Sequence, residues 1–179
     1  MRGSEFLEDL CLKYRDYVAK GNKVAAKDLK KGRIPAFFPA AYILDGKKLE
    51  NVIGLTAYGI IDIDHITEDE ISCAMNKLKD DRHTVLAYKS ISGHGIHIMF
   101  RYSVDGMRFS LRFNRHPRKL DTFYKRILES IFPYYKDLLH LKIDRQVMNV
   151  QNQLLISYDP ELIFNPSAEP FLINNMILS

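Results

Sequence analysis

The chain has 179 residues and a formal net charge of +4, with 46% hydrophobic and 27% charged residues. This composition is that of a globular protein and excludes a disordered tail or a fibrous repeat, and the length suits one domain or two small packed modules. The two cysteines, Cys11 and Cys73, form no CxxC pair, which argues against a thiolate zinc site and favours a reducing compartment.

The sequence has no segment that is typical of export or membrane insertion. No apolar run approaches the roughly 18 residues that a membrane span requires, and the first residues do not resemble a signal peptide. We therefore expect a cytoplasmic protein without membrane contact. Residues 1–6, Met-Arg-Gly-Ser-Glu-Phe, look like an expression-vector remnant, and we expect no functional residue among them.

The first third of the chain predicts a helix, a connector and two strands. Apolar side chains three and four residues apart indicate an amphipathic helix over 6–18, and Gly21 follows as a stop. A basic connector is expected at 27–33. Residues 34–39 contain prolines and permit only a short or edge strand. The apolar, β-branched run at 55–64 predicts a longer strand.

The middle of the chain predicts a helix followed by a hairpin. Residues 67–70 have the pattern of a capping box, which predicts a helix that continues to about Lys79. Residues 83–91 and 96–100 are rich in strand-forming side chains, and the glycine-containing segment 92–95 between them is typical of a turn.

The last third of the chain predicts one helix and two short strands. Apolar positions over 123–131 indicate a helix that Asp121 caps and that ends near Pro133. The runs 141–144 and 154–157 are the last strand candidates. Strands and helices mixed around a central hairpin predict an α+β fold built on an antiparallel or mixed sheet.

The strand at 55–64 ends in a pair of carboxylates, Asp62 and Asp64. Side chains two apart on a strand share a face, with Cα atoms about 6.6 Å apart. Two converging carboxylates are costly unless a cation or a basic group neutralises them, and Mg²⁺ prefers such oxygen ligands. The plainer alternative is a DxD sequence that only caps the strand or the following helix.

A glycine turn follows, and its candidate ligand-binding residues are Ser92, Gly93, His94, Gly95 and His97. Glycines allow a tight turn with exposed amide donors that can hold phosphate oxygens, while Ser92 and His97 offer further donors. The plainer alternative is a hairpin turn with a histidine on its polar face. Zinc binding by the two histidines is disfavoured because no third ligand stands nearby at a familiar spacing.

A third acidic residue, Asp144, follows an apolar strand candidate. Together with Asp62 and Asp64 it supplies the three carboxylates that two metal ions, about 3.5–4 Å apart, need in order to act on a 3′-hydroxyl and a departing pyrophosphate.

The basic residues are concentrated between Arg101 and Arg126, where eight of them stand against two acids. Such a segment is typical of a surface that meets a polyanion, although a solvated face is an equal alternative. Phe109 and Phe113 are interleaved with the basic residues and either stack on bases or belong to the core. The candidate nucleic-acid contacts are Arg108, Arg112, Arg115, Arg118 and Lys119.

Taken together, three motifs resemble those of the archaeo-eukaryotic primase, or primase-polymerase, superfamily. They are the apolar strand ending in Asp-x-Asp at 60–64, the serine-glycine turn ending in x-His at 92–97, and the apolar residue followed by Asp at 143–144. More closely, the chain resembles primase-like amino-terminal domains related to virulence-associated protein E, and that likeness extends through 29–37 and 157–166.

The resemblance implies an RRM-like catalytic module at about 55–170, with a smaller amino-terminal α/β module at about 7–54, in a single domain spanning 7–179. It also implies that Asp62, Asp64 and Asp144 hold catalytic Mg²⁺ or Mn²⁺, while Ser92 and His97 bind nucleotide phosphates. The chain has Gln151-Asn152-Gln153 where relatives often carry an arginine, which predicts a weaker hold on a triphosphate.

The expected function is therefore that of a DNA primase or polymerase. It would add nucleotides from nucleoside triphosphates on a single-stranded DNA template, in replication of a mobile element and alongside a helicase domain or protein. One alternative is a replication-initiator or relaxase nuclease with Tyr124 as its nucleophile. Another is a noncatalytic RRM-like module that binds nucleic acid.

Overall fold

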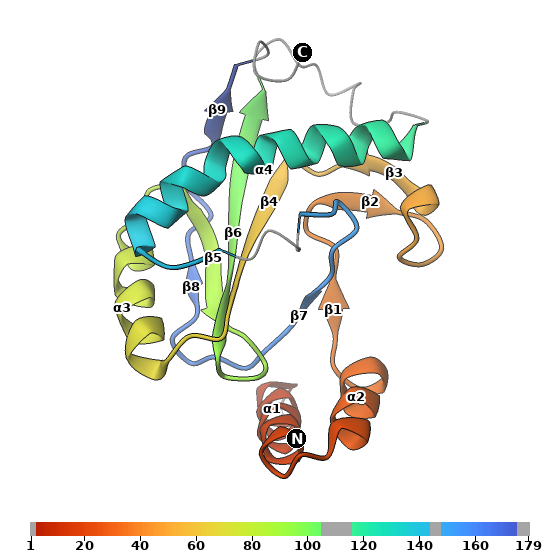
Figure 1. Ribbon diagram of the computed structural model, residues 1–179, viewed down its shortest axis with the longest axis vertical. Helices are drawn as coiled ribbons and strands as arrows, with labels where there is room; N and C mark the ends of the chain where they lie inside the picture. The colour runs from red at the N-terminus through yellow and green to blue at the C-terminus, as the bar shows by residue number, and fades with distance from the viewer. Residues whose placement is uncertain (1–2, 105–115, 144–147, 175–179) are drawn as a thin grey trace.

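The computed structural model describes residues 3–104, 116–143 and 148–174. Within them the chain alternates helices and short strands (Figure 1), which confirms the α+β class. The elements in chain order are α1 (Gly3–Ala19), α2 (Lys23–Gly32), β1 (Ala36–Phe37), β2 (Ala41–Ile43), the 3-10 helix η1 (Leu49–Asn51), β3 (Val52–Leu55), β4 (Tyr58–Asp64), α3 (Glu68–Lys79), β5 (Thr84–Lys89), β6 (Gly95–Val104), α4 (Pro117–Leu139), β7 (Leu154–Leu155), β8 (Ile163–Phe164) and β9 (Phe171–Ile173).

The main sheet has the strand order β4-β6-β5-β8, with antiparallel neighbours throughout, and β9 pairs in parallel with the end of β6. The predicted hairpin is confirmed as β5 and β6, joined at the glycine turn. The register of β4 on β6 places Asp62 opposite His97 and Asp64 opposite Gly95. Two smaller antiparallel sheets pair β2 with β3 and β1 with β7.

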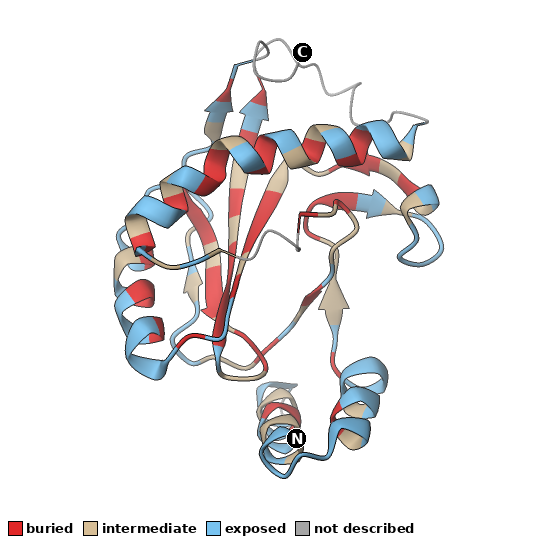
Figure 2. Cartoon of the chain, in the orientation of Figure 1, coloured by how far each residue is buried: buried red, intermediate tan, exposed pale blue. Residues whose placement is uncertain are grey.

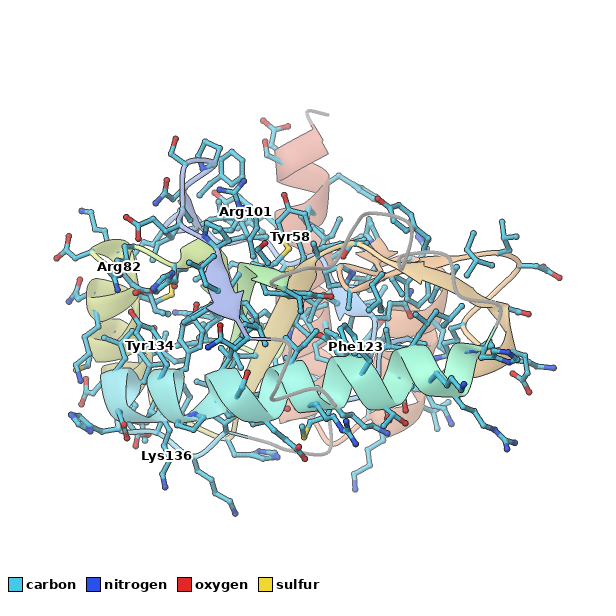
Figure 3. All side chains as sticks on the ribbon, turned by 90° about the horizontal axis from the view of Figure 1, so that it is seen from above. Tyr58, Arg82, Arg101, Phe123, Tyr134 and Lys136 are labelled. Carbon is cyan, nitrogen blue, oxygen red and sulfur yellow. The ribbon has the colours of Figure 1, made fainter. Side chains whose placement is uncertain are left out.

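The pleat of the main sheet divides its side chains between a face that packs in the main core and the opposite face. Ile61 and Ile63 are fully buried in the main core, together with Tyr124 of α4, and Figure 2 shows the buried stripe of α4 turned toward the strands. Since neighbouring side chains alternate along a strand, Asp62 and Asp64 lie on the other face. Figure 3 shows Tyr58 and Arg101, which are register partners, on the side of the sheet away from α4.

The first two helices pack on the rest of the chain through a second, smaller core. Cys11, Ile34 and Ile91 are its buried members. The strand that follows these helices, β1, pairs with β7 from the far end of the sequence. In Figure 1 the α1–α2 pair accordingly lies beyond the end of the main sheet where β5 turns into β6.

Two predictions for the first half of the chain were wrong in detail. The expected connector at 27–33 is largely helical, because α2 runs to Gly32. Its cap is Asn22, whose side chain accepts a hydrogen bond from the Ala25 amide at 3.1 Å. The expected strand at 55–64 is divided into β3 and β4, because Ala57 has a φ of 72° and breaks the extended backbone.

The predictions for the last third also need correction. Pro133 lies inside α4 and does not end it, and the residue that precedes the helix is His116 instead of Asp121. Asp121 is buried within α4, where its carboxylate accepts from the Val150 amide at 3.0 Å and from Lys125 at 2.7 Å. Residues 141–143 have no regular structure, and only Leu154–Leu155 of the expected last strand is extended.

None of the helices in the described part of the chain is long and apolar enough to cross a bilayer.

Candidate functional site

A cleft of about 860 Å³ lies where the α1–α2 pair, the glycine turn, the end of β4 and the β1–β7 pair meet. The cleft collects side chains from segments that are far apart in the sequence. Its charged lining consists of four lysines and two aspartates, namely Lys27, Lys30, Lys31, Lys47, Asp62 and Asp64.

Asp62 and His97 face each other on the floor of the cleft. They are partners in the β4–β6 register, and the His97 Nε2 atom lies 3.5 Å from the Asp62 Oδ1 atom. Both side chains are largely buried, with 15% of the Asp62 side chain and 10% of the His97 side chain exposed. Asp64 is exposed at the end of the same strand. The structure thus brings together the carboxylate pair and the histidine that the sequence indicated.

His97 is neutral at physiological pH. Burial lowers the pKa of its imidazole to about 4, and the positive charge of Lys30 acts in the same direction. These two effects outweigh the nearby Asp62 carboxylate, which alone would favour the charged ring. Tyr88 holds the ring from β5 in an edge-on contact with centroids 5.1 Å apart, and the Nδ1 atom has no hydrogen-bond partner among the described residues.

The glycine turn is held by its own hydrogen bonds. The Gly93 amide donates to the Ser90 carbonyl at 2.9 Å, and Gly93 has a φ of +79°, a conformation that favours glycine. The Ser92 hydroxyl lies 3.0 Å from that of Ser90 and accepts from the His94 amide at 3.3 Å. Ser90, Ser92 and His97 line the cleft, whereas His94 is exposed and lies outside its lining.

Gly95 sets the spacing between the turn and the carboxylate strand. A β-carbon at this position would lie 2.4 Å from the Ile63 carbonyl oxygen and 2.9 Å from the Asp64 Oδ1 atom. Only a residue without a side chain therefore allows β6 to begin directly against the end of β4. The role of this glycine is close approach, in addition to the turn that the sequence predicted.

Several predicted site residues do not join the cleft in the described structure. Asp144, Arg108, Arg112 and Arg115 lie outside the described residues. Arg118 and Lys119 are exposed in the first turn of α4, where they line shallower depressions with Thr122 and Phe123.

Tyr124, the nucleophile of the relaxase alternative, is fully buried. Its hydroxyl accepts a hydrogen bond from the Ile60 amide at 3.3 Å, and burial raises the pKa of the phenol strongly. The hydroxyl is therefore inaccessible to a DNA strand in this structure.

Asp62 and Asp64 are the candidate ligands for a divalent cation in the cleft. The described residues contain no group of three or more His, Cys, Asp and Glu side chains that can hold a metal ion. Mg²⁺, however, is commonly held by one or two carboxylates together with substrate phosphates and water. Asp62 and Asp64, on one face of β4 and both lining the cleft, fit that arrangement.

The lysines of the cleft were missed as site residues. Lys27, Lys30 and Lys31 fell in the segment interpreted as a connector, although their spacing of three and four residues was a visible signal for one face of a helix. Lys47 and Tyr14 also line the cleft, and nothing in their local sequence distinguishes them from surface residues.

Comparisons with known proteins give one family assignment. The family model described as "BT4734-like, N-terminal domain" matches residues 29–164, which is most of the chain. No curated protein and no solved structure matches the chain. The resemblance to the primase-polymerase superfamily, including the domains related to virulence-associated protein E, was therefore wrong as a family assignment, because the match places the chain in a different family.

Proposed function

The chain belongs to the family of BT4734-like N-terminal domains, and we propose that its cleft is the active site of a divalent-cation-dependent nucleotidyltransferase. The substrate would be a nucleoside triphosphate, and the acceptor a nucleic-acid strand on a single-stranded DNA template. The observation that carries this proposal is the grouping of Asp62, Asp64 and His97 in one cleft that lysines also line.

Each residue has a chemical role in this proposal. Asp62 and Asp64 would hold Mg²⁺ or Mn²⁺ with their carboxylate oxygens. When bound, the cation supplies positive charge that neutralises the phosphate oxygens and lowers the pKa of an attacking hydroxyl. The neutral His97 imidazole and the Ser92 hydroxyl, which both line the cleft, would donate hydrogen bonds to phosphate oxygens and orient the triphosphate.

The proposed reaction is an in-line displacement at the α-phosphorus. The 3′-oxygen of the acceptor strand forms a bond to the α-phosphorus, and the bond from that phosphorus to the bridging oxygen of pyrophosphate breaks. The hydroxyl proton passes to solvent water, and pyrophosphate leaves with the electron pair. The residues of the cleft contribute positioning and charge stabilisation, which are the main sources of catalysis in phosphoryl transfer.

We propose that the main sheet serves as an RRM-like platform for this site. The strands β4, β6 and β5 present the site on one face, while α3 and α4 cover the other. Arg118 and Lys119, exposed at the start of α4, belong to the basic segment that we propose to contact the template. Because contacts between basic side chains and phosphates release counterions, template binding should weaken as salt increases.

The test is incorporation of labelled nucleotides by the purified chain. Single-stranded DNA, with and without an annealed primer, is incubated with nucleoside triphosphates and either Mg²⁺ or Mn²⁺. We expect labelled product from the wild type and a loss on the order of 100-fold or more in Asp62→Asn. A bound cation contributes several kcal/mol of transition-state stabilisation, and a loss of about 2.7 kcal/mol of it lowers the rate about 100-fold. Asp137→Asn, an exposed aspartate on α4, is the matched control and should retain full activity.

Salt-dependent binding of single-stranded DNA by the wild type, with no synthesis in either metal, would contradict the proposed enzyme. It would instead favour a noncatalytic module that binds nucleic acid.

A further inference from the structure

The helix α2 turns three lysines toward the cleft. Lys27, Lys30 and Lys31 are spaced three and four residues apart, are exposed, and line the cleft together. We call them the lysine face. Ala26 and Leu29 of the same helix point elsewhere: Ala26 is buried, and Leu29 packs against the second core. The helix is thus anchored through its apolar side and presents positive charge to the cleft.

The lysine face has no acidic partner in the described structure. No carboxylate lies within 4.0 Å of any of its three ammonium groups among the described residues. Like charges at these spacings destabilise a helix by about 0.2–0.5 kcal/mol for each pair, and α2 has only 10 residues, too few for an isolated helix to be stable. The lysine face is therefore an unfavourable feature for folding that a bound anion would relieve.

The charges of the cleft have opposite signs in different places. The carboxylates Asp62 and Asp64 attract a cation, while the lysine face and Lys47 attract an anion. A bare nucleic-acid strand would meet the lysines favourably and the carboxylates unfavourably. A nucleotide that carries its triphosphate together with a divalent cation has a group for each part of the cleft.

The dimensions favour a small ligand over a strand. The cleft of about 860 Å³ lies within the range of small-molecule sites, roughly 300–1,000 Å³. Lys27 and Lys31 are four residues apart on the helix, which is about 6 Å along its axis. Three positive charges within such a short distance match the compact charge of a triphosphate.

The structure also fixes the position of the α1–α2 pair relative to the glycine turn. Arg15 of α1 donates to the Ile91 carbonyl at 3.1 Å, and Ile91 is itself part of the second core with Cys11 and Ile34. Lys30 lines the same cleft as Asp62 and His97, so the lysine face and the carboxylate pair border one space and can act on one ligand.

We propose that the lysine face binds the β- and γ-phosphates of a nucleoside triphosphate, which makes the α1–α2 pair a polyphosphate-binding arm of the cleft. The identification of the anion as a nucleotide rests on the proposed function, whereas the binding of a polyphosphate does not. This arm also supplies positive charge in a cleft whose Gln151, Asn152 and Gln153 carry none.

The experiment measures binding of inorganic tripolyphosphate by isothermal titration calorimetry, without divalent cation. The wild type is compared with the triple variant Lys27→Gln, Lys30→Gln, Lys31→Gln and with Lys23→Gln, a control on the same helix outside the cleft lining. We expect the triple variant to bind at least 30-fold more weakly and the control to stay within twofold. All four side chains are exposed, so circular dichroism should show an unchanged fold.

Comparison of tripolyphosphate binding with synthesis and with oligonucleotide binding separates this inference from the proposed function. If tripolyphosphate binding depends on the lysine face, the polyphosphate-binding arm is supported even when the wild type shows no synthesis and the proposed function has failed. Equal tripolyphosphate affinity in the wild type and the triple variant overturns it. If the triple variant loses affinity for a single-stranded oligonucleotide but not for tripolyphosphate, the lysines hold a strand and the inference is wrong.

Discussion

Replacing Gly95 by alanine tests whether close approach at the end of β4 holds the site together. The new β-carbon would lie 2.4 Å from the Ile63 carbonyl oxygen, whereas ordinary contact begins at 3.4 Å, so the two strands must separate by about 1 Å. The obstacle is backbone and cannot rotate away. Overpacking of this kind costs about 1–3 kcal/mol, and we expect the free energy of unfolding to fall by about 2 kcal/mol.

The assay is urea unfolding followed by far-UV circular dichroism and by tyrosine fluorescence, since the chain has ten tyrosines and no tryptophan. A loss of about 2 kcal/mol corresponds to a decrease in Tm of about 4–8 °C for a chain of this size. Gly32→Ala is the control, because its β-carbon would meet nothing within 4 Å and its φ is not in the left-handed region. That variant should be as stable as the wild type or up to about 1 kcal/mol more stable.

The two glycine variants together decide the argument. If Gly95→Ala unfolds at the same urea concentration as the wild type, or if Gly32→Ala loses as much stability, the close contact is not what requires glycine at the start of β6.

Three other predictions concern the helices and the carboxylate pair. Thr67→Ala removes the capping box that Thr67 and Glu70 form at the start of α3 and should lower the free energy of unfolding by about 1 kcal/mol; an unchanged thermal melt would contradict it. Tyr124→Phe removes the hydroxyl that accepts a hydrogen bond from the Ile60 amide on the edge strand β4. It should lower the free energy of unfolding in urea by about 1–2 kcal/mol, and an unchanged free energy of unfolding would contradict this role of the hydroxyl. Mg²⁺ at ten times its dissociation constant should add about 1.4 kcal/mol to the stability of the wild type and nothing to that of Asp62→Asn, as measured by thermal melts. An equal gain in both proteins would mean that Asp62 does not bind the cation.

The parts of the fold that sequence reasoning predicted correctly are those with local signals. The capping box at 67–70 marks the start of α3 because it satisfies amides within four residues of each other. The glycine turn marks the β5–β6 hairpin for the same reason, since its geometry depends on adjacent residues. Asp62, Asp64 and His97 were recognised as candidates because polar side chains at the end of an apolar strand are unusual, and the hairpin then carries His97 beside β4.

The remainder depended on tertiary contacts. Pro133 predicts the end of a helix, because proline removes a hydrogen bond and clashes with the preceding turn at about 3 kcal/mol. The helix continues because Ile131, Phe132, Tyr135 and Leu139 are all buried on its apolar side, and their burial exceeds that cost. Asp121 is a residue type that often caps helices, but its carboxylate instead accepts a hydrogen bond from the Val150 amide, 29 residues away.

The lysine face was hidden for a related reason. In isolation the basic stretch around Lys30 has the charge of a solvated connector, and only the packing of Ala26 and Leu29 on the second core makes it a helix with a defined orientation. The pairing of β1 with β7 joins segments that no local pattern connects. The sequence therefore predicted a pair of carboxylates beside a histidine, but not the cleft that the lysines of α2 and residues 151–155 form around them.

The joining of the two ends of the sequence has a consequence for synthesis of the protein. The Tyr158 amide donates to the Cys11 sulfur across 147 positions, and the Ile156 amide donates to the Pro35 carbonyl. The contacts that tie β7 and Tyr158 to β1 and α1 can therefore form only after almost the whole chain has been synthesised. We expect a translation product that ends at about residue 150 to lack β7 and the part of the cleft lining that residues 151–155 supply.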